Sequence, residues 1–403
     1  MNKETYIVDG TRSAFGNFGG TLSTVRTDDL LAHVLRELVE ANPDIPKDAY
    51  DDVIIGCANQ AGEDNRNIAR MGLLLAGLPW SVPGETVNRL CASGMSAIVH
   101  GHRAIQAGDG DLFISGGVEH MTRGPWVISK VSKPFGRDAE MHDSSFGWRF
   151  VNPKMKELYG TDGMGTTAEN LAEMYKISRE DQDKFAYWSQ MKASKARSEG
   201  RFNREISSIE IPQRKADPIV FAEDEFIKPN TNLEILGKLR TAFKKEGGTV
   251  TAGNASGLND GAAAVILASY EAVKKYDLNP IARIVSSAVV GVEPRIMGIG
   301  PVGATNKALD KAGLSLSDMG VIELNEAFAA QSLACTRQLG LADDDPRINP
   351  NGGAIAIGHP LGASGTRISF SAALELHEKQ VQYGLATMCV GVGQGYALVM
   401  EKV

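Results

Sequence analysis

Short apolar segments alternate with segments of helical pattern along most of this chain of 403 residues, and this alternation constrains the fold more than any other feature. Each apolar segment is continuous, as strands are when both faces of a sheet are covered. The intervening segments are long enough to form the covering helices. The pattern therefore predicts a layered α/β architecture. The expected strands are 6–9, 53–57, 112–115, 264–268, 281–285, 321–324, 385–390 and 396–400, and the expected helices are 28–40, 92–107, 179–199, 305–312, 328–339 and 361–379.

Residues 120–250 interrupt this alternation with a different composition. Aromatic residues, charges and prolines replace the apolar strand pattern there, including Trp126 and Pro153. Such a segment is typical of a lobe inserted over a sheet core, where substrate contacts often lie. The two flanking halves each place a Ser-Gly helix start beside a reactive side chain, which indicates a duplication. We therefore expect an N-terminal half over 1–270, with a loop domain inserted at about 120–250, and a C-terminal half over 271–403.

The composition excludes several classes of protein. The 42 Lys and Arg residues against 49 Asp and Glu residues give a net charge of −7, which argues against nucleic-acid binding. No run of apolar residues approaches the roughly 18 that a membrane-spanning helix needs. Four cysteines in a chain of this length do not form a disulfide framework, so we expect reduced thiols. With no signal or transit peptide pattern visible, the expected location is the cytoplasm.

Two cysteines and one histidine lie in glycine-rich segments that permit a close approach of the backbone to a ligand. Cys91 is followed by Ala-Ser-Gly at the start of an expected helix, where the helix dipole favours a thiolate. His359 lies between a glycine and a proline, and Cys389 precedes the run Val-Gly-Val-Gly. A cysteine alone is as often a small buried apolar residue, as we expect for Cys57 and Cys335. The three together indicate acyl transfer through one sulfur, with the other thiol moving a proton.

Two further segments offer polar groups. Asn325 directly follows an expected strand, where it would orient His359 or hold a water molecule; an asparagine there is equally often a helix cap. The loop 251–261 is small, polar and glycine-rich and suits a long thin ligand, but it lacks the Gly-Lys-Ser/Thr signature of a phosphate-binding loop. The chain contains no Cys-x-x-Cys and no paired histidine spacing, so we expect no zinc or other metal.

These segments resemble the thiolases, the acetyl-CoA acyltransferases, over almost the whole chain, from about Thr5 to Lys402. The resemblance rests on blocks in the family's order: NRLCASG at 88–94, GNASG at 253–257, NEAF at 325–328, GHP at 358–360 and CVGVG at 389–393. It implies two halves with the same βαβαβαββ topology, a five-layer α/β/α/β/α arrangement and a loop domain inserted in the first half. It also implies a homodimer or homotetramer, with coenzyme A as co-substrate and no permanently bound cofactor.

The resemblance also implies a role for each reactive residue. Cys91, activated by His359, would attack the 3-keto carbon of a 3-oxoacyl-CoA, and Cys389 would protonate the departing acetyl-CoA enolate. The acyl group would stay on Cys91 as a thioester until a CoA thiol collects it, and the reverse reaction is a Claisen condensation. His359, with a water held by Asn325, would form one oxyanion hole. The backbone N–H groups of Cys91 and Gly391 would form the other.

Other positions resemble those that contact the substrates in thiolases. The positions implied for the pantetheine channel and the nucleotide end of coenzyme A are Met164, Lys228, Ala252, Ser256, Leu258 and Phe328. A surface lysine without a ligand is the more ordinary explanation of Lys228.

The substrate implied by the resemblance has a polar end. Short-chain acetoacetyl-CoA thiolases commonly carry His-Met where this chain has Gly163-Met164, which opens the acyl pocket. The segments 146–153 and 211–218 resemble the 3-oxoadipyl-CoA thiolases of aromatic catabolism. Arg149 is the candidate to bind the terminal carboxylate of such a substrate, and a solvated loop arginine is equally compatible with the sequence. Acetoacetyl-CoA formation and cleavage of medium-chain 3-oxoacyl-CoA are the alternatives.

A decarboxylating ketoacyl synthase and a cysteine hydrolase are the rival enzymes. Either would use Cys91 with His359, and neither needs a cysteine at position 389. A catalytically silent carrier or scaffold protein is disfavoured because every reactive position is occupied. The second thiol therefore distinguishes a thiolase from its rivals.

Overall fold

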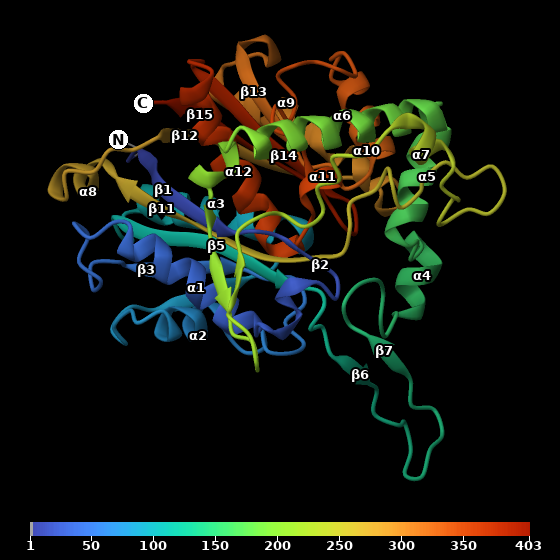
Figure 1. Ribbon diagram of the computed structural model, residues 1–403, viewed down its shortest axis with the longest axis horizontal. Coiled ribbons are helices and arrows are strands. Elements are labelled where there is room, and N and C mark those ends of the chain that lie inside the picture. The colour runs from blue at the N-terminus through green and yellow to red at the C-terminus, as the bar shows by residue number, and fades with distance from the viewer. Residues whose placement is uncertain (1–2) are drawn as a thin grey trace.

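The computed structural model describes residues 3–403, and most of its strands belong to one continuous mixed sheet (Figure 1). The strands of the N-terminal half, in sheet order, are β4 (Gly84–Val87), β3 (Asp52–Gly56), β5 (Leu112–His120), β11 (Asn259–Ser269) and β1 (Thr5–Ser13). β3 is parallel to β4 and β5, whereas β11 is antiparallel to β5 and β1. Two short strands add to this half: β2 (Gly16–Asn17) pairs with β11, and β8 (Ile206–Ser207) pairs with β1.

The C-terminal half repeats this order of strands. Its strands, in sheet order, are β13 (Met319–Leu324), β14 (Tyr383–Val390), β15 (Gln394–Lys402) and β12 (Ala282–Gly291). β13 and β14 are parallel, and the next two pairings are antiparallel, as in the first half. In the position that corresponds to β4, Ile348 makes a single parallel bridge to Ile322. The expected duplication is confirmed, with one strand reduced to one paired residue.

Helices cover both faces of each half of the sheet and form a five-layer stack (Figure 1). The outer layers are α1 (Thr27–Glu40) with α2 (Ile68–Leu75) on the N-terminal half, and α9 (Gly300–Ala312) with α10 (Ala329–Gln338) on the C-terminal half. The central layer consists of α3 (Ser93–Ala107) and α12 (Leu361–Glu378). The two halves join where β1 pairs with β12, with Ile7 opposite Ala282.

Alternate residues of each strand face different helical layers. In β5, Ile114 shares a buried cluster with α1 and α2, whereas its neighbour Phe113 shares one with α3. In β15, Val399 packs with α9 and Leu398 packs with α12. Because both faces of these strands are buried, the strands read as continuous apolar runs in the sequence. The predicted α/β/α/β/α layering is confirmed.

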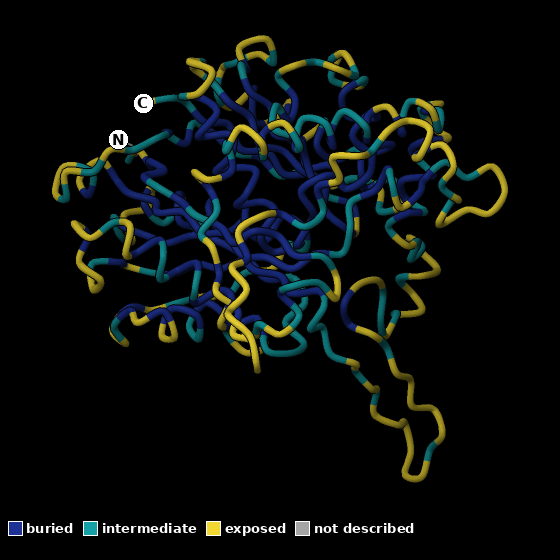
Figure 2. Tube along the Cα trace, viewed as in Figure 1, coloured by how far each residue is buried: buried dark blue, intermediate teal, exposed yellow. Residues whose placement is uncertain are grey.

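The segment between β5 and β11 forms the inserted loop domain. Its helices are α4 (Pro153–Tyr159), α5 (Met164–Met174), α6 (Arg179–Ser198) and α7 (Leu233–Gly237), and its strand pairs are β6 (Trp126–Ile128) with β7 (Met141–Asp143) and β9 (Ile209–Ile211) with β10 (Ile219–Phe221). The β6–β7 hairpin extends away from the body and is largely exposed (Figure 2). None of the helices formed by residues 3–403 has the length and apolar character needed to cross a membrane.

Every expected strand and helix is present, but several strands are longer than expected. β5 continues beyond its apolar run, through two glycines, to His120. β11 begins before its apolar run, at Asn259, and passes through four small residues. The apolar pattern is therefore shorter than either strand. The edge strand β4 was missed because its sequence is largely polar. The helices α2, α8 (Tyr270–Lys275) and α11 (Ala354–Ile357) were also missed, as were α4, α5 and α7 of the inserted domain.

Backbone contacts at glycines bring the N-termini of the two central helices together. A Cβ atom at Gly117 of β5 would lie 1.9 Å from the carbonyl oxygen of Gly362, in the first turn of α12. A Cβ atom at Gly94, in the first turn of α3, would lie 2.5 Å from the same oxygen. Atoms of side chains essentially never approach backbone this closely, so these positions require glycine. The two helix starts therefore meet at the end of β5.

Gly117→Ala tests this junction. The added Cβ forces the backbone of β5 and α12 apart, so we expect the free energy of unfolding to fall by about 2 kcal/mol or more. Gly237→Ala is the matched control, because a Cβ there meets nothing within 4 Å, and its effect should stay within about 0.5 kcal/mol. Urea unfolding measures both. Equal stability of the two variants would contradict the close approach.

Candidate active site

Cys91 lies in the 3-10 turn η2 (Leu90–Ala92), immediately before α3. Leu90 adopts a left-handed conformation with φ of 46°, and its N–H donates to Oδ1 of Asn88 at 2.8 Å. Ser93 Oγ accepts from the N–H of Arg89 at 2.9 Å and donates to the carbonyl oxygen of Leu90 at 2.7 Å. These local hydrogen bonds fix a strained turn and leave the Cys91 side chain 8% exposed.

The protonation state of Cys91 follows from its burial. Burial raises the pKa of the Cys91 thiol to about 11. Backbone N–H groups of Gly391 and of Cys91 itself favour the thiolate but do not offset burial, and Glu119 adds to the rise. Backbone N–H groups at this turn do favour the thiolate, as expected there, but burial outweighs them, so Cys91 is a neutral thiol at pH 7.

His359 is held by hydrogen bonds at both ring nitrogens. Its Nδ1 lies 2.6 Å from Oγ of Ser364, which donates its own proton to the carbonyl oxygen of Pro360 at 2.9 Å. Nδ1 is therefore the protonated nitrogen, and the lone pair of Nε2 faces the side-chain amide of Asn325 at 3.3 Å. Burial, with the nearby Arg367 guanidinium, lowers the pKa of His359 to about 3. The ring is therefore a neutral imidazole whose unprotonated nitrogen is Nε2.

Asn325 directly follows β13 and is completely buried. Its backbone N–H donates to the carbonyl oxygen of Thr387 at 3.0 Å, and its Nδ2 faces His359. Its Oδ1 has no hydrogen-bond partner within residues 3–403. The alternative role of helix cap is wrong, because α10 begins at Ala329 and has Phe328 at its N-cap. A buried unpaired amide oxygen is costly and is expected where a ligand or a water molecule binds.

Cys389 lies at the end of β14, in the hairpin that leads to β15. Val392 and Gly393 turn the chain with φ of 62° and 85°, so that Cys389 pairs with Gly395 across the hairpin. Burial raises the pKa of the Cys389 thiol well above its usual range, and the nearby Cys91 thiol adds to the rise. Turn η2 contacts both β14 and α12. The structure therefore brings the elements that carry Cys91, His359 and Cys389 together.

An apolar wall adjoins the two cysteines. Cys389 and Phe328 belong to one buried cluster, and Met164 of α5 packs against it. A Cβ atom at Gly391 would lie 3.1 Å from Cδ1 of Leu90 and 3.9 Å from Sδ of Met164. Gly391 thus lies between the Cys91 turn and the inserted domain.

The loop 251–258 runs along the same wall. Ala255 bridges to Phe328, and the N–H of Ser256 donates to the carbonyl oxygen of Ala327 at 3.0 Å. Leu258 is half-buried, and Ala252 is exposed. The loop is therefore pinned beside Phe328 while its outer residues face solvent.

Lys228 lies farther out and is exposed. Its ammonium lies 4.7 Å from the centre of the Phe226 ring, and a Cβ at Gly257 would lie 2.7 Å from that ring. Phe226 thus connects Lys228 to the outer end of the loop 251–258.

Arg149 of the inserted domain points its guanidinium at neutral oxygens. Nη2 donates to Oδ1 of Asn59 at 3.0 Å, and Nη1 donates to the carbonyl oxygen of Ser144 at 3.3 Å. Both of these hydrogen-bond partners are uncharged. The loop that carries Asn59 is tied to the Cys91 turn, because Nδ2 of Asn88 donates to the carbonyl oxygen of Ala58 at 3.0 Å.

A buried carboxylate cluster was missed by sequence reasoning. Glu119, at the end of β5, accepts backbone N–H groups from Ala58, Asn59 and Gly362 at 2.9 to 3.0 Å, the last of them in the first turn of α12. Cys57 Sγ lies 3.5 Å from a carboxylate oxygen of Asp64. Cys57 is thus buried but not purely apolar in its contacts. Asp64 likewise accepts the backbone N–H groups of Gln60 and Gly62, so both carboxylates are hydrogen-bonded to donors of the chain itself. The sequence feature that could have identified Glu119 is a charged residue near the end of an otherwise apolar, glycine-containing strand.

The neutral state of Cys91 predicts the pH dependence of its alkylation. Only the thiolate reacts, so the rate constant with iodoacetamide should rise about tenfold per pH unit from pH 7 to pH 9 without a plateau. Peptide mass spectrometry separates Cys91 from the other cysteines. The urea-unfolded chain is the control and should level off near the ordinary cysteine pKa of about 8.5. A plateau below pH 8 in the folded protein would contradict the assignment.

Comparison with known proteins agrees with this geometry. Residues 5–271 match the family model for the N-terminal domain of thiolase, and residues 278–402 match that for its C-terminal domain. The chain is 56% identical over 401 residues to the 3-oxoadipyl-CoA/3-oxo-5,6-dehydrosuberyl-CoA thiolase of Escherichia coli (strain K12). It is also 56% identical over 401 residues to a beta-ketoadipyl-CoA thiolase of Acinetobacter baylyi. Each alignment covers 100% of both chains. A crystal structure of human mitochondrial 3-ketoacyl-CoA thiolase in complex with CoA is similar with a TM-score of 0.92 at 41% identity, covering 100% of this chain and 98% of that chain. The chain belongs to the thiolase family and is an acyltransferase.

Proposed function

We propose that Cys91, His359 and Cys389 carry out the thiolase reaction in this protein, with coenzyme A as co-substrate. The observation that carries the proposal is the pair of buried thiols on η2 and β14, with a neutral histidine just before α12, which contacts η2. A hydrolase or a decarboxylating synthase would leave Cys389 without a role.

The first half of the reaction acylates Cys91. As the Cys91 sulfur attacks the 3-keto carbon, its proton moves to Nε2 of His359. The tetrahedral adduct collapses with cleavage of the bond between C2 and C3, and the electron pair of that bond goes to C2 as the enolate of acetyl-CoA. Cys389 gives its proton to C2 and becomes a thiolate. The shortened acyl group stays on Cys91 as a thioester.

The second half releases the acyl group. The thiol of a second coenzyme A gives its proton to the Cys389 thiolate and attacks the thioester carbon. The adduct expels the Cys91 thiolate, which recovers its proton from His359. Both thiols and the imidazole return to their neutral states, consistent with the burial of all three side chains.

Under this proposal, two sets of donors stabilise the oxyanions. The backbone N–H groups of Cys91 and Gly391 lie next to the Cys91 sulfur and suit the thioester oxygen. Asn325, with a water molecule on its unpaired Oδ1, and His359 suit the enolate oxygen. A single oriented donor of this kind contributes about 3–4 kcal/mol in comparable sites.

Coenzyme A would approach along the apolar wall described above. Met164 and Phe328 lie beside Cys389, and the loop 251–258 continues outward. Under this proposal the wall and loop hold the pantetheine arm, and the exposed ammonium of Lys228 interacts with the phosphates. The residues in this role are Met164, Lys228, Ala252, Ser256, Leu258 and Phe328.

Cys389→Ser separates the two thiols. Cys91 should still accept an acetyl group from acetyl-CoA, while cleavage and condensation should fall by a factor of about 100 to 10,000 because the proton donor is lost. Cys91→Ala should abolish both activities. Intact-protein mass spectrometry detects the acetyl adduct, and thiol release measures turnover.

The matched control is Cys335→Ser, the same exchange at a buried cysteine of α10, and it should leave both activities unchanged. Condensation that persists in Cys389→Ser without an acetyl adduct would reverse the proposed division of labour.

We further propose that the substrate is 3-oxoadipyl-CoA, with Arg149 bound to its terminal carboxylate. The names of the two bacterial relatives support this substrate class. Arg149 supports this substrate independently. Its guanidinium is half-buried and has only neutral partners, so it can donate two hydrogen bonds to a carboxylate. The alternative, acetoacetyl-CoA formation, would leave Arg149 without a role.

Arg149→Gln tests this assignment. Loss of a charge-assisted pair worth about 2–3 kcal/mol should lower kcat/KM for 3-oxoadipyl-CoA by a factor of roughly 30 to 150, and kcat/KM for acetoacetyl-CoA should change less than about threefold. Arg137→Gln, at an exposed arginine of the same domain, is the matched control and should leave both values unchanged. Equal losses on the two substrates would remove Arg149 from the pocket.

We base the proposed assembly on exposed apolar side chains and the proposed location on the free thiols. We propose a homodimer or homotetramer, because Trp126, Ile128 and Phe135 of the β6–β7 hairpin are 68%, 65% and 102% exposed and a second copy would cover them. Sedimentation equilibrium that returned a single 43.1 kDa chain would contradict this.

The cytoplasm is the proposed location, because the reaction needs both Cys91 and Cys389 as free thiols. Cell fractionation tests it.

A further inference from the structure

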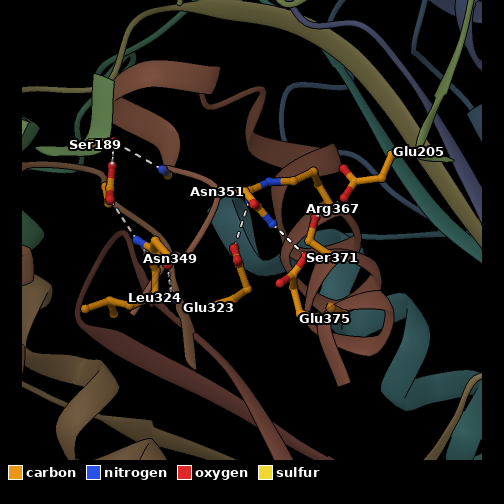
Figure 3. A network of polar contacts seen from close by, with 12 residues as sticks. Ser189, Glu205, Glu323, Leu324, Asn349, Asn351, Arg367, Ser371 and Glu375 are labelled. Atoms are coloured by element: carbon orange, nitrogen blue, oxygen red, sulfur yellow. Dashed lines mark hydrogen bonds and ion pairs between the residues drawn. The ribbon is translucent and has the colours of Figure 1, made fainter. Parts of the chain in front are cut away.

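Glu326 follows Asn325 directly, yet its carboxylate points away from the reacting groups into a buried hydrogen-bond network. It accepts from Oγ of Ser189 at 2.6 Å, from Nδ2 of Asn349 at 2.7 Å and from the N–H of Ile355 at 3.2 Å. Figure 3 shows Ser189 and Asn349 within this network. The three donors come from α6 of the inserted domain, from the segment after Ile348 and from α11.

The geometry requires a carboxylate at this position. Oε1 of Glu326 receives Asn349, and Oε2 receives both Ser189 and Ile355, so every partner is a donor. An amide would place its own N–H groups against one of these donors. The carboxyl group also lies flat against Gly353, where a Cβ would come within 2.2 Å of Cδ of Glu326.

The same network holds the segment that leads to His359. Ser189 Oγ accepts the N–H of Gly353 at 3.1 Å, and Nε2 of Gln190 donates to the carbonyl oxygen of Ile355 at 3.1 Å. Both contacts fix α11, which ends two residues before His359. Glu326 therefore fixes Asn325 through the chain and His359 through α11.

One hydrogen bond extends the network toward the proposed coenzyme A path. Oε1 of Gln190 accepts the backbone N–H of Lys228 at 2.7 Å. Adjacent residues of α6 thus contact the loop that carries Lys228 and the helix that precedes His359. The inserted domain and the active-site histidine are linked by a short series of buried hydrogen bonds.

We propose that Glu326 is a positioning residue that sets the separation of Asn325 and His359, and that Ser189 of the inserted domain completes this function. The inference rests on the proposed roles of Asn325 and His359. Glu326 touches neither substrate nor coenzyme A. Its effect passes through α11 and the end of β13, so it acts on the rate of Cys91 acylation and not on the binding of coenzyme A.

Glu326→Gln is the direct test, with acetyl-CoA and acetoacetyl-CoA as the probes. We expect kcat and the single-turnover rate of Cys91 acetylation to fall at least tenfold, while KM for coenzyme A stays within twofold. The alkylation rate of Cys91 by iodoacetamide, which does not use His359, should also stay within twofold. This split separates positioning from a general loss of structure.

Ser189→Ala is the second variant and keeps the proposal falsifiable if Glu326→Gln does not fold. It removes one donor to Glu326 and the acceptor for Gly353, so acetylation should slow about three- to tenfold with an unchanged KM. Ser198→Ala is the matched control on the same helix, because Ser198 Oγ donates only to the carbonyl oxygen of Lys195 on the exposed face. It should leave every value unchanged.

Three results would overturn the proposal. Unchanged acetylation in folded Glu326→Gln or in Ser189→Ala would show that the network does not position His359. Equal losses in acetylation and alkylation would show a structural role alone. Failure of the wild-type protein to acetylate Cys91 would remove the proposed function itself, and with it this inference. The wild-type reaction, run in parallel, distinguishes that outcome from the first two.

Discussion

The structure depends on the close approach of two helix starts at the end of β5. Because Gly117 and Gly94 carry no side chain, the first turn of α12 lies directly against the sheet and against α3. Glu119 then binds the N–H of Gly362 at that turn. Cys91 precedes α3 and His359 precedes α12, so the same contact sets the distance between the two reactive side chains. Replacing either glycine would separate the core layers and the reacting groups together.

Burial, more than the helix dipole, determines the charge of the site. The backbone N–H groups of Gly391 and Cys91 favour a thiolate, but removal of water from Cys91 costs more than those groups return. The same burial keeps His359 neutral. A site of neutral groups avoids placing isolated charges in a low-dielectric interior. Negative charge then develops only on the carbonyl oxygen of the bound substrate, where the hydrogen-bond donors of the protein can stabilise it.

The sequence allowed the layered fold and the segments of Cys91, His359 and Cys389 to be predicted, because apolar runs and glycine-rich segments are local signals. It did not allow the partners of Glu326 to be predicted. Ser189 lies 137 positions away from Glu326, and their hydrogen bond depends on how α6 packs over α11. The neutral state of Cys91 could not be predicted either, because burial is a property of the whole fold. Local pattern identified the reactive atoms, and tertiary packing determined their protonation and alignment.

The reduced strand at Ile348 has a consequence for the symmetry of the protein. In the N-terminal repeat, β4 pairs with β3 along its length. In the C-terminal repeat a single bridge remains at Ile348, and the residues that follow form the segment 349–358. Cys91 and His359 stand at equivalent points of the two repeats, each just ahead of the central helix. Two identical repeats would present the same side chain twice at the pseudo-twofold axis. Joining the repeats in one chain lets one position hold a nucleophile and the other a base, so that a symmetric scaffold carries an asymmetric reaction.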